Sequence, residues 1–144
     1  MSALAISAER RSDAALLIEG YASVFGVEDL SGDVVRAGAF SGAARNHPLP
    51  MLLQHRSGSI IGQWVRVLED GRGLFVRGLI NEKSAACLVR NGLDGLSIGF
   101  RPRVWTVRPG GGRLLSKIDL VEVSLVADPM LPSARFKVVS GSVQ

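Results

Sequence analysis

The dipeptide Asp70-Gly71 lies between two apolar runs, and it constrains the fold more than any other feature of the sequence. Asp-Gly between runs of this kind is a strong local signal for a tight β-turn. Residues 60–69 and 74–80 are therefore predicted to pair as an antiparallel hairpin. A chain with such a hairpin at its middle is expected to build its core around a β-sheet.

Apolar alternation predicts further strands on both sides of this hairpin, over residues 16–25, 34–35, 51–55, 96–107 and 114–127. Pro102 interrupts one of these runs and is expected at an edge, a bulge or a break, because proline cannot donate a ladder hydrogen bond. The glycine-rich stretch 109–112 is expected to turn the chain between the last two strands.

Two helices are expected beside the strands. Residues 81–92 carry apolar residues at helical spacing and end in Asn91-Gly92, which is typical of a helix stop. A shorter helix over residues 38–45 should end before Pro48. The predicted fold class is mainly β with flanking helices, arranged as an antiparallel β-barrel of about seven strands.

Length and composition limit the domain organisation and the partners. The 144 residues are expected to form a single domain, 1–144, with loose termini at about 1–14 and 138–144. Seventeen Lys and Arg exceed thirteen Asp and Glu, but they are scattered and no aromatic residues interleave with them, which disfavours nucleic-acid binding.

The single cysteine and the lengths of the apolar runs indicate where the protein is expected to be located. Cys87 is the only cysteine, so no internal disulfide can form, which fits a reducing compartment. No run reaches 18 apolar residues, so no membrane partner is expected and the cytoplasm is the expected location. The sequence suggests neither a cofactor nor a metal.

The segment 94–100 places a hydroxyl in the middle of an otherwise apolar strand. Because side chains alternate along a strand, Ser97 should share one face with Gly99 and Arg101 while the apolar residues between them enter the core. The glycines near Ser97 leave room for a reacting carbonyl to approach a nucleophile. The alternative is a half-exposed serine without a role, since no G-x-S-x-G turn is present.

His55 and Glu122 also interrupt apolar strands. Val121, Val123 and Leu125 are expected to face the core, which leaves Glu122 on the opposite face. A hydroxyl, an imidazole and a carboxylate can act as nucleophile, general base and orienting acid if they lie within hydrogen-bond reach. The alternatives are a histidine at a strand end and a solvated glutamate.

Four segments, taken together and in this order, resemble the prohead (capsid maturation) serine proteases of HK97-like tailed phages. They are residues 18–26 with 31–40, 51–55 with 61–62, 96–100, and 120–126. The resemblance implies a fold similar to the seven-stranded barrel of the herpesvirus assemblin proteases. It also implies a serine endopeptidase that cleaves the major capsid protein and scaffold within the assembling prohead, in the cytoplasm of the bacterial host.

The same resemblance implies that Ser97 is the nucleophile and His55 the base. It favours Glu122 as the third catalytic residue, whereas the assemblin proteases use a second histidine there. His47 is a rival base, although it lies in a polar loop. Arg101 follows the serine on the expected face and is a candidate for the oxyanion site, with an exposed strand arginine as the alternative.

Two alternatives remain open. Family members commonly continue into a longer C-terminal region, whereas this sequence stops at Gln144; a compact form, such as that of a gene transfer agent, and a trimmed product are both consistent with this. The competing function is a non-catalytic structural or scaffold barrel of a capsid. The distance between Ser97 Oγ and the His55 ring distinguishes the two functions, and a homodimer is left open.

Overall fold

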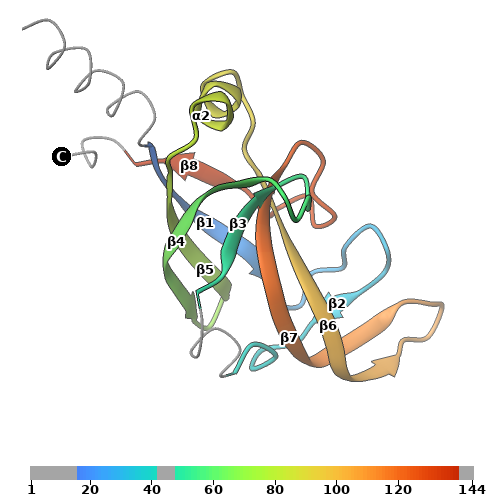
Figure 1. The fold of residues 1–144 in the computed structure, drawn as a ribbon. Helices are drawn as coiled ribbons and strands as arrows, with labels where there is room; N and C mark the ends of the chain where they lie inside the picture. Colours follow the sequence, from blue (N-terminus) through green and yellow to red (C-terminus); the bar gives the residue numbers. More distant parts are fainter. Residues whose placement is uncertain (1–15, 42–47, 140–144) are drawn as a thin grey trace, which may run out of the picture.

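A computed structural model describes residues 16–41 and 48–139 of the chain. In chain order the elements are β1 (Leu16–Val24), β2 (Val34–Val35), β3 (Pro50–Leu53), β4 (Ile60–Glu69), β5 (Gly73–Ile80), α2 (Lys83–Arg90), β6 (Gly95–Val107), β7 (Arg113–Val126) and β8 (Phe136–Val138) (Figure 1). The fold is mainly β with one short helix in the described part, in agreement with the predicted class.

The predicted central hairpin is confirmed. Strands β4 and β5 pair antiparallel, and Asp70 N–H donates to the carbonyl of Gly73 at 2.9 Å to close the turn. The helix prediction is also confirmed, because the Glu82 side chain caps α2 by accepting from the backbone N–H of Ala85. Beyond the helix, Gly92 has φ +112°, a conformation that favours glycine.

Other expectations fall at the chain ends or outside the described residues. His47 and residues 42–45 of the predicted short helix lie outside them, and residues 38–41 form turns. Strand β8 was not predicted: Val138 pairs with Ile18 of β1, and Val139 N–H donates to the carbonyl of Leu17 at 2.8 Å. The structure is therefore regular two residues into the terminus that was expected to be loose.

The eight described strands form one sheet in the order β2-β7-β3-β4-β5-β1-β8, with β6 paired to β7. The expectation of an antiparallel sheet is wrong in two places, because β2 and β3 both run parallel to β7. Local alternation predicts a strand but does not encode its direction relative to a distant strand. The sheet is therefore mixed.

The expected closed barrel is not confirmed. Along the described strands, an isolated bridge between Gly95 and Arg135 is the contact that joins the start of β6 to the residue before β8. Its hydrogen bonds run from Leu96 N–H to the Ala134 carbonyl and from Phe136 N–H to the Asp94 carbonyl, both 2.9 Å. A bridge of this length is not a continuous strand ladder.

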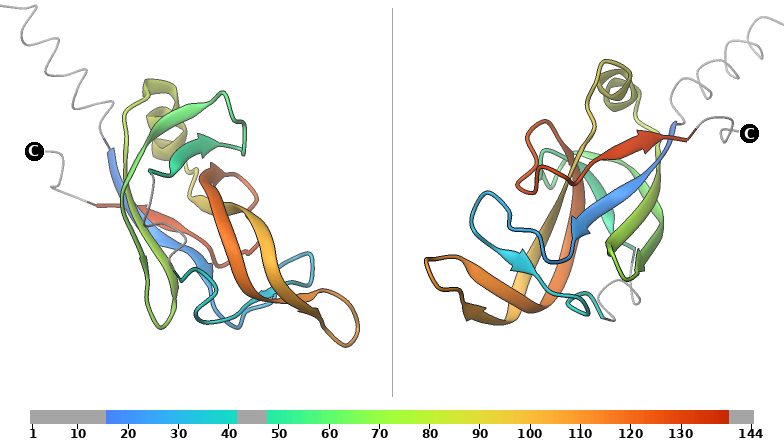
Figure 2. Two further views of the ribbon diagram at one scale, coloured as in Figure 1. Left: turned by 60° about the horizontal axis from the view of Figure 1, so that its bottom comes forward. Right: turned by 180° about the vertical axis from the view of Figure 1, so that it is seen from behind.

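The sheet curves around an apolar core to which most of the elements contribute. Ile18, Met51, Val76, Leu96 and Val123 are all fully buried there. The far part of the β6–β7 hairpin extends away from this core (Figure 2), and residues 103–107 of β6 are exposed. Pro102 lies within β6 without ending it, because the described part of the chain pairs only one edge of this strand there.

A bulge divides the two parts of this hairpin. Gly99 lies opposite Glu122, but the next residue, Phe100, lies opposite Leu120, so Val121 has no partner on β6. Val121 was expected to face the core and is 42% exposed, because the extra residue shifts the alternation of β7 at this point. None of the described helices is both long and apolar enough to cross a membrane.

Candidate active site

The candidate site forms where the end of β3 lies beside the C-terminal part of β7. Parallel pairing places Leu52 beside Ser124, so that the turn after β3 runs along β7. Gln54 anchors this turn twice, because its N–H donates to the Leu125 carbonyl at 2.9 Å and its Oε1 accepts from the N–H of Ala127 at 3.0 Å. The turn that carries His55 is thereby held to the strand that carries Glu122.

The backbone of this turn is strained. Gln54 and His55 have φ of +54° and +61°, the left-handed region that side chains with a Cβ rarely adopt. Each such residue costs roughly 1–2 kcal/mol, and strain of this kind persists only where the surroundings fix it. Here the surroundings are the two hydrogen bonds that tie Gln54 to β7 and the residue after it.

A hydrogen bond joins His55, in the turn, to Glu122, on β7. The His55 Nδ1 atom lies 2.5 Å from Oε2 of Glu122, and the Glu122 residue is only 8% exposed. Since the carboxylate accepts at Nδ1, we assign the proton of the neutral ring to Nδ1, which leaves Nε2 as the proton acceptor. This is the tautomer that a general base requires.

Ser124 completes the polar cluster, and sequence reasoning assigned it no role. Its hydroxyl donates to Oε1 of Glu122 at 2.6 Å and accepts from the backbone N–H of His55 at 3.1 Å. The residue is fully buried. The sequence does place Ser124 on the same face of its strand as Glu122. It does not show that the backbone of His55 lies beside this face.

Gly99 makes room for this arrangement. It lies opposite Glu122 across the β6–β7 pair, as Ser97 lies opposite Ser124, so the predicted shared face of Ser97 and Glu122 is present. A Cβ on Gly99 would collide with the Glu122 carboxylate, including the oxygen that contacts His55. Glycine therefore allows Glu122 to extend over β6 towards the histidine.

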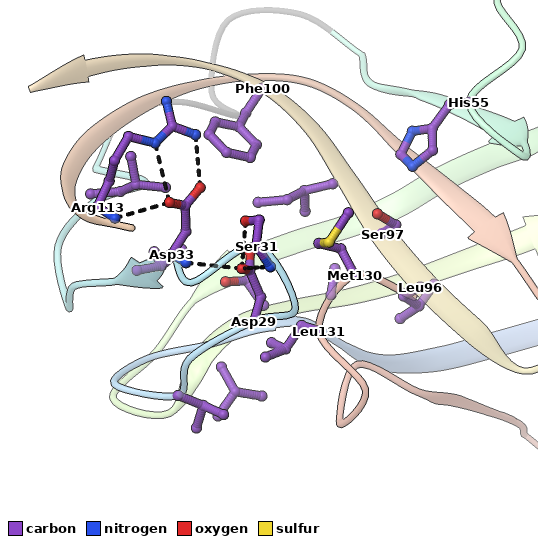
Figure 3. Close-up of a pocket in the computed structure, with 17 residues that line it drawn as sticks. Asp29, Ser31, Asp33, His55, Leu96, Ser97, Phe100, Arg113, Met130 and Leu131 are labelled. Carbon is purple, nitrogen blue, oxygen red and sulfur yellow. Dashed lines mark hydrogen bonds and ion pairs between the residues drawn. The ribbon is translucent and has the colours of Figure 1, made fainter. Parts of the chain in front are cut away.

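Ser97 and His55 line one pocket with a volume of about 270 Å³. Figure 3 shows them at one end of it, with Asp33 and Arg113 at the other. No hydrogen bond joins Ser97 Oγ to the His55 ring in the described part of the chain, so the pairing of these two residues stays a prediction. The apolar walls of the pocket include Val35, Leu96, Ile98, Phe100, Leu115 and Met130.

Asp33 and Arg113 close the far end of the pocket. Arg113 donates to Asp33 through Nη2 at 2.7 Å, through Nε at 3.2 Å and through its backbone N–H at 3.1 Å. The hydrogen bonds from Arg113 lower the pKa of Asp33, and the same pair raises the pKa of Arg113. Sequence reasoning missed this pair, whose members lie 80 residues apart.

Arg101 is the one candidate that the structure separates from the others. It lies beyond the bulge, opposite Asp119, and its side chain is exposed and does not line the pocket with Ser97. No hydrogen bond or ion pair joins Arg101 to Ser97 or His55 among the described residues, and its part in the oxyanion site stays a prediction. No cluster of His, Cys, Asp and Glu that could hold a metal occurs among the residues described.

Comparison with known proteins adds a family and a fold. Residues 2–144 match the family model described as Caudovirus prohead serine protease. The prohead protease of Enterobacteria phage HK97 is 32% identical over 125 residues, which cover 78% of this chain and 55% of that protein. This chain therefore spans about half the length of that curated relative.

Solved herpesvirus proteases share the fold. The protease of Kaposi's sarcoma-associated herpesvirus in complex with a hexapeptide phosphonate inhibitor has a TM-score of 0.66 at 16% identity, covering 87% of this chain and 65% of that one. The same protease with an allosteric inhibitor has a TM-score of 0.58 at 14% identity, covering 86% and 77%. The predicted similarity to the assemblin fold is confirmed at this level.

Proposed function

This chain belongs to the caudovirus prohead serine protease family, and we propose that it is a serine endopeptidase that cleaves capsid and scaffold proteins during prohead maturation. The observation that carries the proposal is the pairing of His55 with buried Glu122 at the mouth of a pocket that Ser97 also lines. The site of action follows from the substrate: the inside of an assembling prohead, in the cytoplasm of the bacterial host.

The proposed chemistry assigns one step to each residue. His55 Nε2 takes the proton of Ser97 Oγ as this oxygen attacks the scissile carbonyl carbon, and Glu122 stabilises the imidazolium that forms. His55 then gives the proton to the leaving amine, so that the peptide C–N bond breaks and an ester of Ser97 remains. Water, deprotonated by the same histidine, hydrolyses the ester and restores the serine.

The pocket supports a substrate contact beside the nucleophile. Its walls are mostly apolar, and Asp33 at the far end is already neutralised by Arg113. We therefore propose that an apolar side chain next to the scissile bond enters it. The loops that form one wall are joined by a hydrogen bond from Leu30 N–H to the Met130 carbonyl at 2.9 Å.

Two finer points belong to the same proposal. The Gly95–Arg135 bridge is the place where the curved sheet would close into a barrel of the assemblin type. The proposal includes a possible homodimer, but the cleavage chemistry described above uses residues of one chain only. The alternative function, a non-catalytic capsid barrel, offers no reason for strained backbone at His55 or for the clearance at Gly99.

Co-expression with the major capsid protein of the same particle tests the proposal. The capsid protein should lose an N-terminal segment, which mass spectrometry of the intact product measures. His55→Ala should abolish this processing, whereas His47→Ala, the matched control, should not. Full processing by His55→Ala would overturn the assignment of the base, and an intact capsid protein with the unmodified enzyme would overturn the proposed function.

A further inference from the structure

We propose that Ser124 is a positioning residue that sets the geometry of Glu122 and His55 for proton transfer. The inference rests on the proposed function, and it concerns a residue to which the sequence pattern assigned no role. Ser124 does not line the pocket, so it acts through the two residues that its hydroxyl contacts.

The hydroxyl of Ser124 joins the two halves of the site. As a donor it binds Oε1 of Glu122 at 2.6 Å, while Oε2 of the same carboxylate accepts from His55 at 2.5 Å. Each carboxylate oxygen thus has its own partner, and the carboxylate cannot rotate without losing one of them. Because Ser124 binds Oε1, Oε2 is the oxygen that remains to face His55.

As an acceptor, the same hydroxyl holds the backbone of the base. It takes the N–H of His55, whose φ of +61° lies in the strained left-handed region. A buried N–H without a partner is costly, so this bond contributes to keeping the strained turn in place. One atom therefore fixes both the side chain of the orienting acid and the main chain of the base.

A purely structural role would give Ser124 a different signature. Alanine at a fully buried serine would then lower stability, and activity would follow only through the fraction of folded protein. In the positioning role, the loss appears in the folded enzyme, because the carboxylate and the imidazole depart from the productive geometry. A displacement of about 1 Å at a catalytic group can cost on the order of a hundredfold in rate.

Kinetics of Ser124→Ala on a peptide spanning the cleavage site found in the capsid experiment provide the first test. We expect kcat to fall by about 10- to 100-fold with KM changed less than threefold, because the substrate pocket is untouched. Val126→Ala is the matched control, because it removes buried atoms from the same strand without touching Glu122 or His55. Its kcat should stay within twofold of the unmodified value.

A double-mutant cycle gives the second readout. In a Glu122→Gln background, Ser124→Ala should cost less than threefold, because the geometry that it protects is already lost. An equal loss in both backgrounds, or a kcat for Ser124→Ala within twofold of the unmodified enzyme, would overturn the inference. Either result leaves capsid processing by the unmodified enzyme intact, so failure of the inference is distinguishable from failure of the proposed function.

A third readout does not depend on activity. Proton NMR of the folded protein should show the strongly downfield Nδ1–H signal of a histidine bonded to a carboxylate. This signal should shift or broaden in Ser124→Ala and persist unchanged in Val126→Ala. An unchanged signal in folded Ser124→Ala would contradict the positioning role.

Discussion

Asp33 lines one end of the pocket, and Glu122 contacts His55, which lines the other end. Both carboxylates are buried, but their partners have different chemistry. Asp33 is 6% exposed and Glu122 is 8% exposed. Asp33 binds the guanidinium of Arg113, which stays charged at any pH a protein survives. Glu122 contacts Nδ1 of the His55 imidazole. A guanidinium only donates hydrogen bonds, whereas a neutral imidazole has one nitrogen that donates and one that accepts.

The backbone differs between the two ends as well. Arg113 begins a regular strand, and its N–H adds a third hydrogen bond to Asp33. His55 is held in a left-handed turn by hydrogen bonds to β7. Its partner Glu122 occupies the space that a Cβ on Gly99 would fill. Burial and pairing alone thus do not mark a catalytic carboxylate. The two ends differ in the chemistry of the partner and in the backbone that holds it.

The largest loss of activity should come from Ser97→Ala. This variant tests whether the bond-breaking step takes place at the end of the pocket that His55 lines. Loss of the nucleophile costs roughly a millionfold in turnover in serine proteases of known mechanism. Stability should change by less than about 1 kcal/mol, because the hydroxyl has no hydrogen-bond partner among the described residues. Capsid processing and thermal unfolding measure the two, and processing by this variant at the normal rate would remove Ser97 as nucleophile.

Glu122→Gln tests the orienting role and should have the next largest effect. The amide keeps the shape but presents the wrong hydrogen-bonding group to His55 Nδ1, which can lower turnover by up to roughly 10⁴. Binding of substrate should change little. The pH profile of cleavage and the unfolding temperature are measured together. Normal activity with a large stability loss would make this pair structural, like the one at the other end.

Gly99→Ala tests the clearance that only the His55 end requires. The new Cβ would push the Glu122 carboxylate away from the histidine, and a shift of about 1 Å can cost on the order of a hundredfold in rate. Gly71→Ala is the control, since a Cβ there meets open space. Full activity of Gly99→Ala would show that the position of Glu122 is not critical.

Asp33→Asn should have the smallest effect on activity and act on stability instead. Hydrogen bonds to a charged partner contribute about 1.5–3 kcal/mol, so unfolding at neutral pH should become easier by an amount in this range. Turnover of the folded enzyme should fall by less than tenfold, because Asp33 contacts neither His55 nor Ser97. A loss of turnover as large as that of Glu122→Gln would show that Asp33 is as important for activity as Glu122, contrary to the difference proposed between the two ends.

The pH dependence of the same variant has a definite sign. Arg113 lowers the folded-state pKa of Asp33, so the stabilisation is fully present above the unfolded-state pKa near 4. It is lost as pH falls through the folded-state pKa. Unfolding of wild type and Asp33→Asn should therefore differ at pH 7 and converge at acid pH, and a constant difference would exclude the ion pair as its cause.

Much of the fold could be predicted because its signals are local. The turn at Asp70, the cap at Glu82 and the stop at Gly92 each depend on a few neighbouring residues, and the bounds of the strands beside them were close to those found. Strand direction, the bulge at Val121 and β8 depend on distant partners. Periodicity contains no information about these partners, so all three were missed or wrong.

The site divides in the same way. Alternation placed Ser97 and Glu122 on a shared face, and a polar residue at a strand end singled out His55. The contribution of Ser124 depends on where the His55 backbone lies, and the Asp33–Arg113 pair joins residues 80 positions apart. Only a three-dimensional structure supplies these relations.

The separation of the site residues along the chain also sets when the candidate site can assemble. His55 and Glu122 are 67 positions apart, and the bond from the His55 N–H to Ser124 spans 69. A ribosome must therefore synthesise the chain through β7, and β7 must align beside β3, before His55 can contact Glu122 and Ser124. Pairing over so many residues carries a larger loop-closure cost than the local turn at Asp70 does. The site therefore cannot form on a nascent chain that has not yet reached β7.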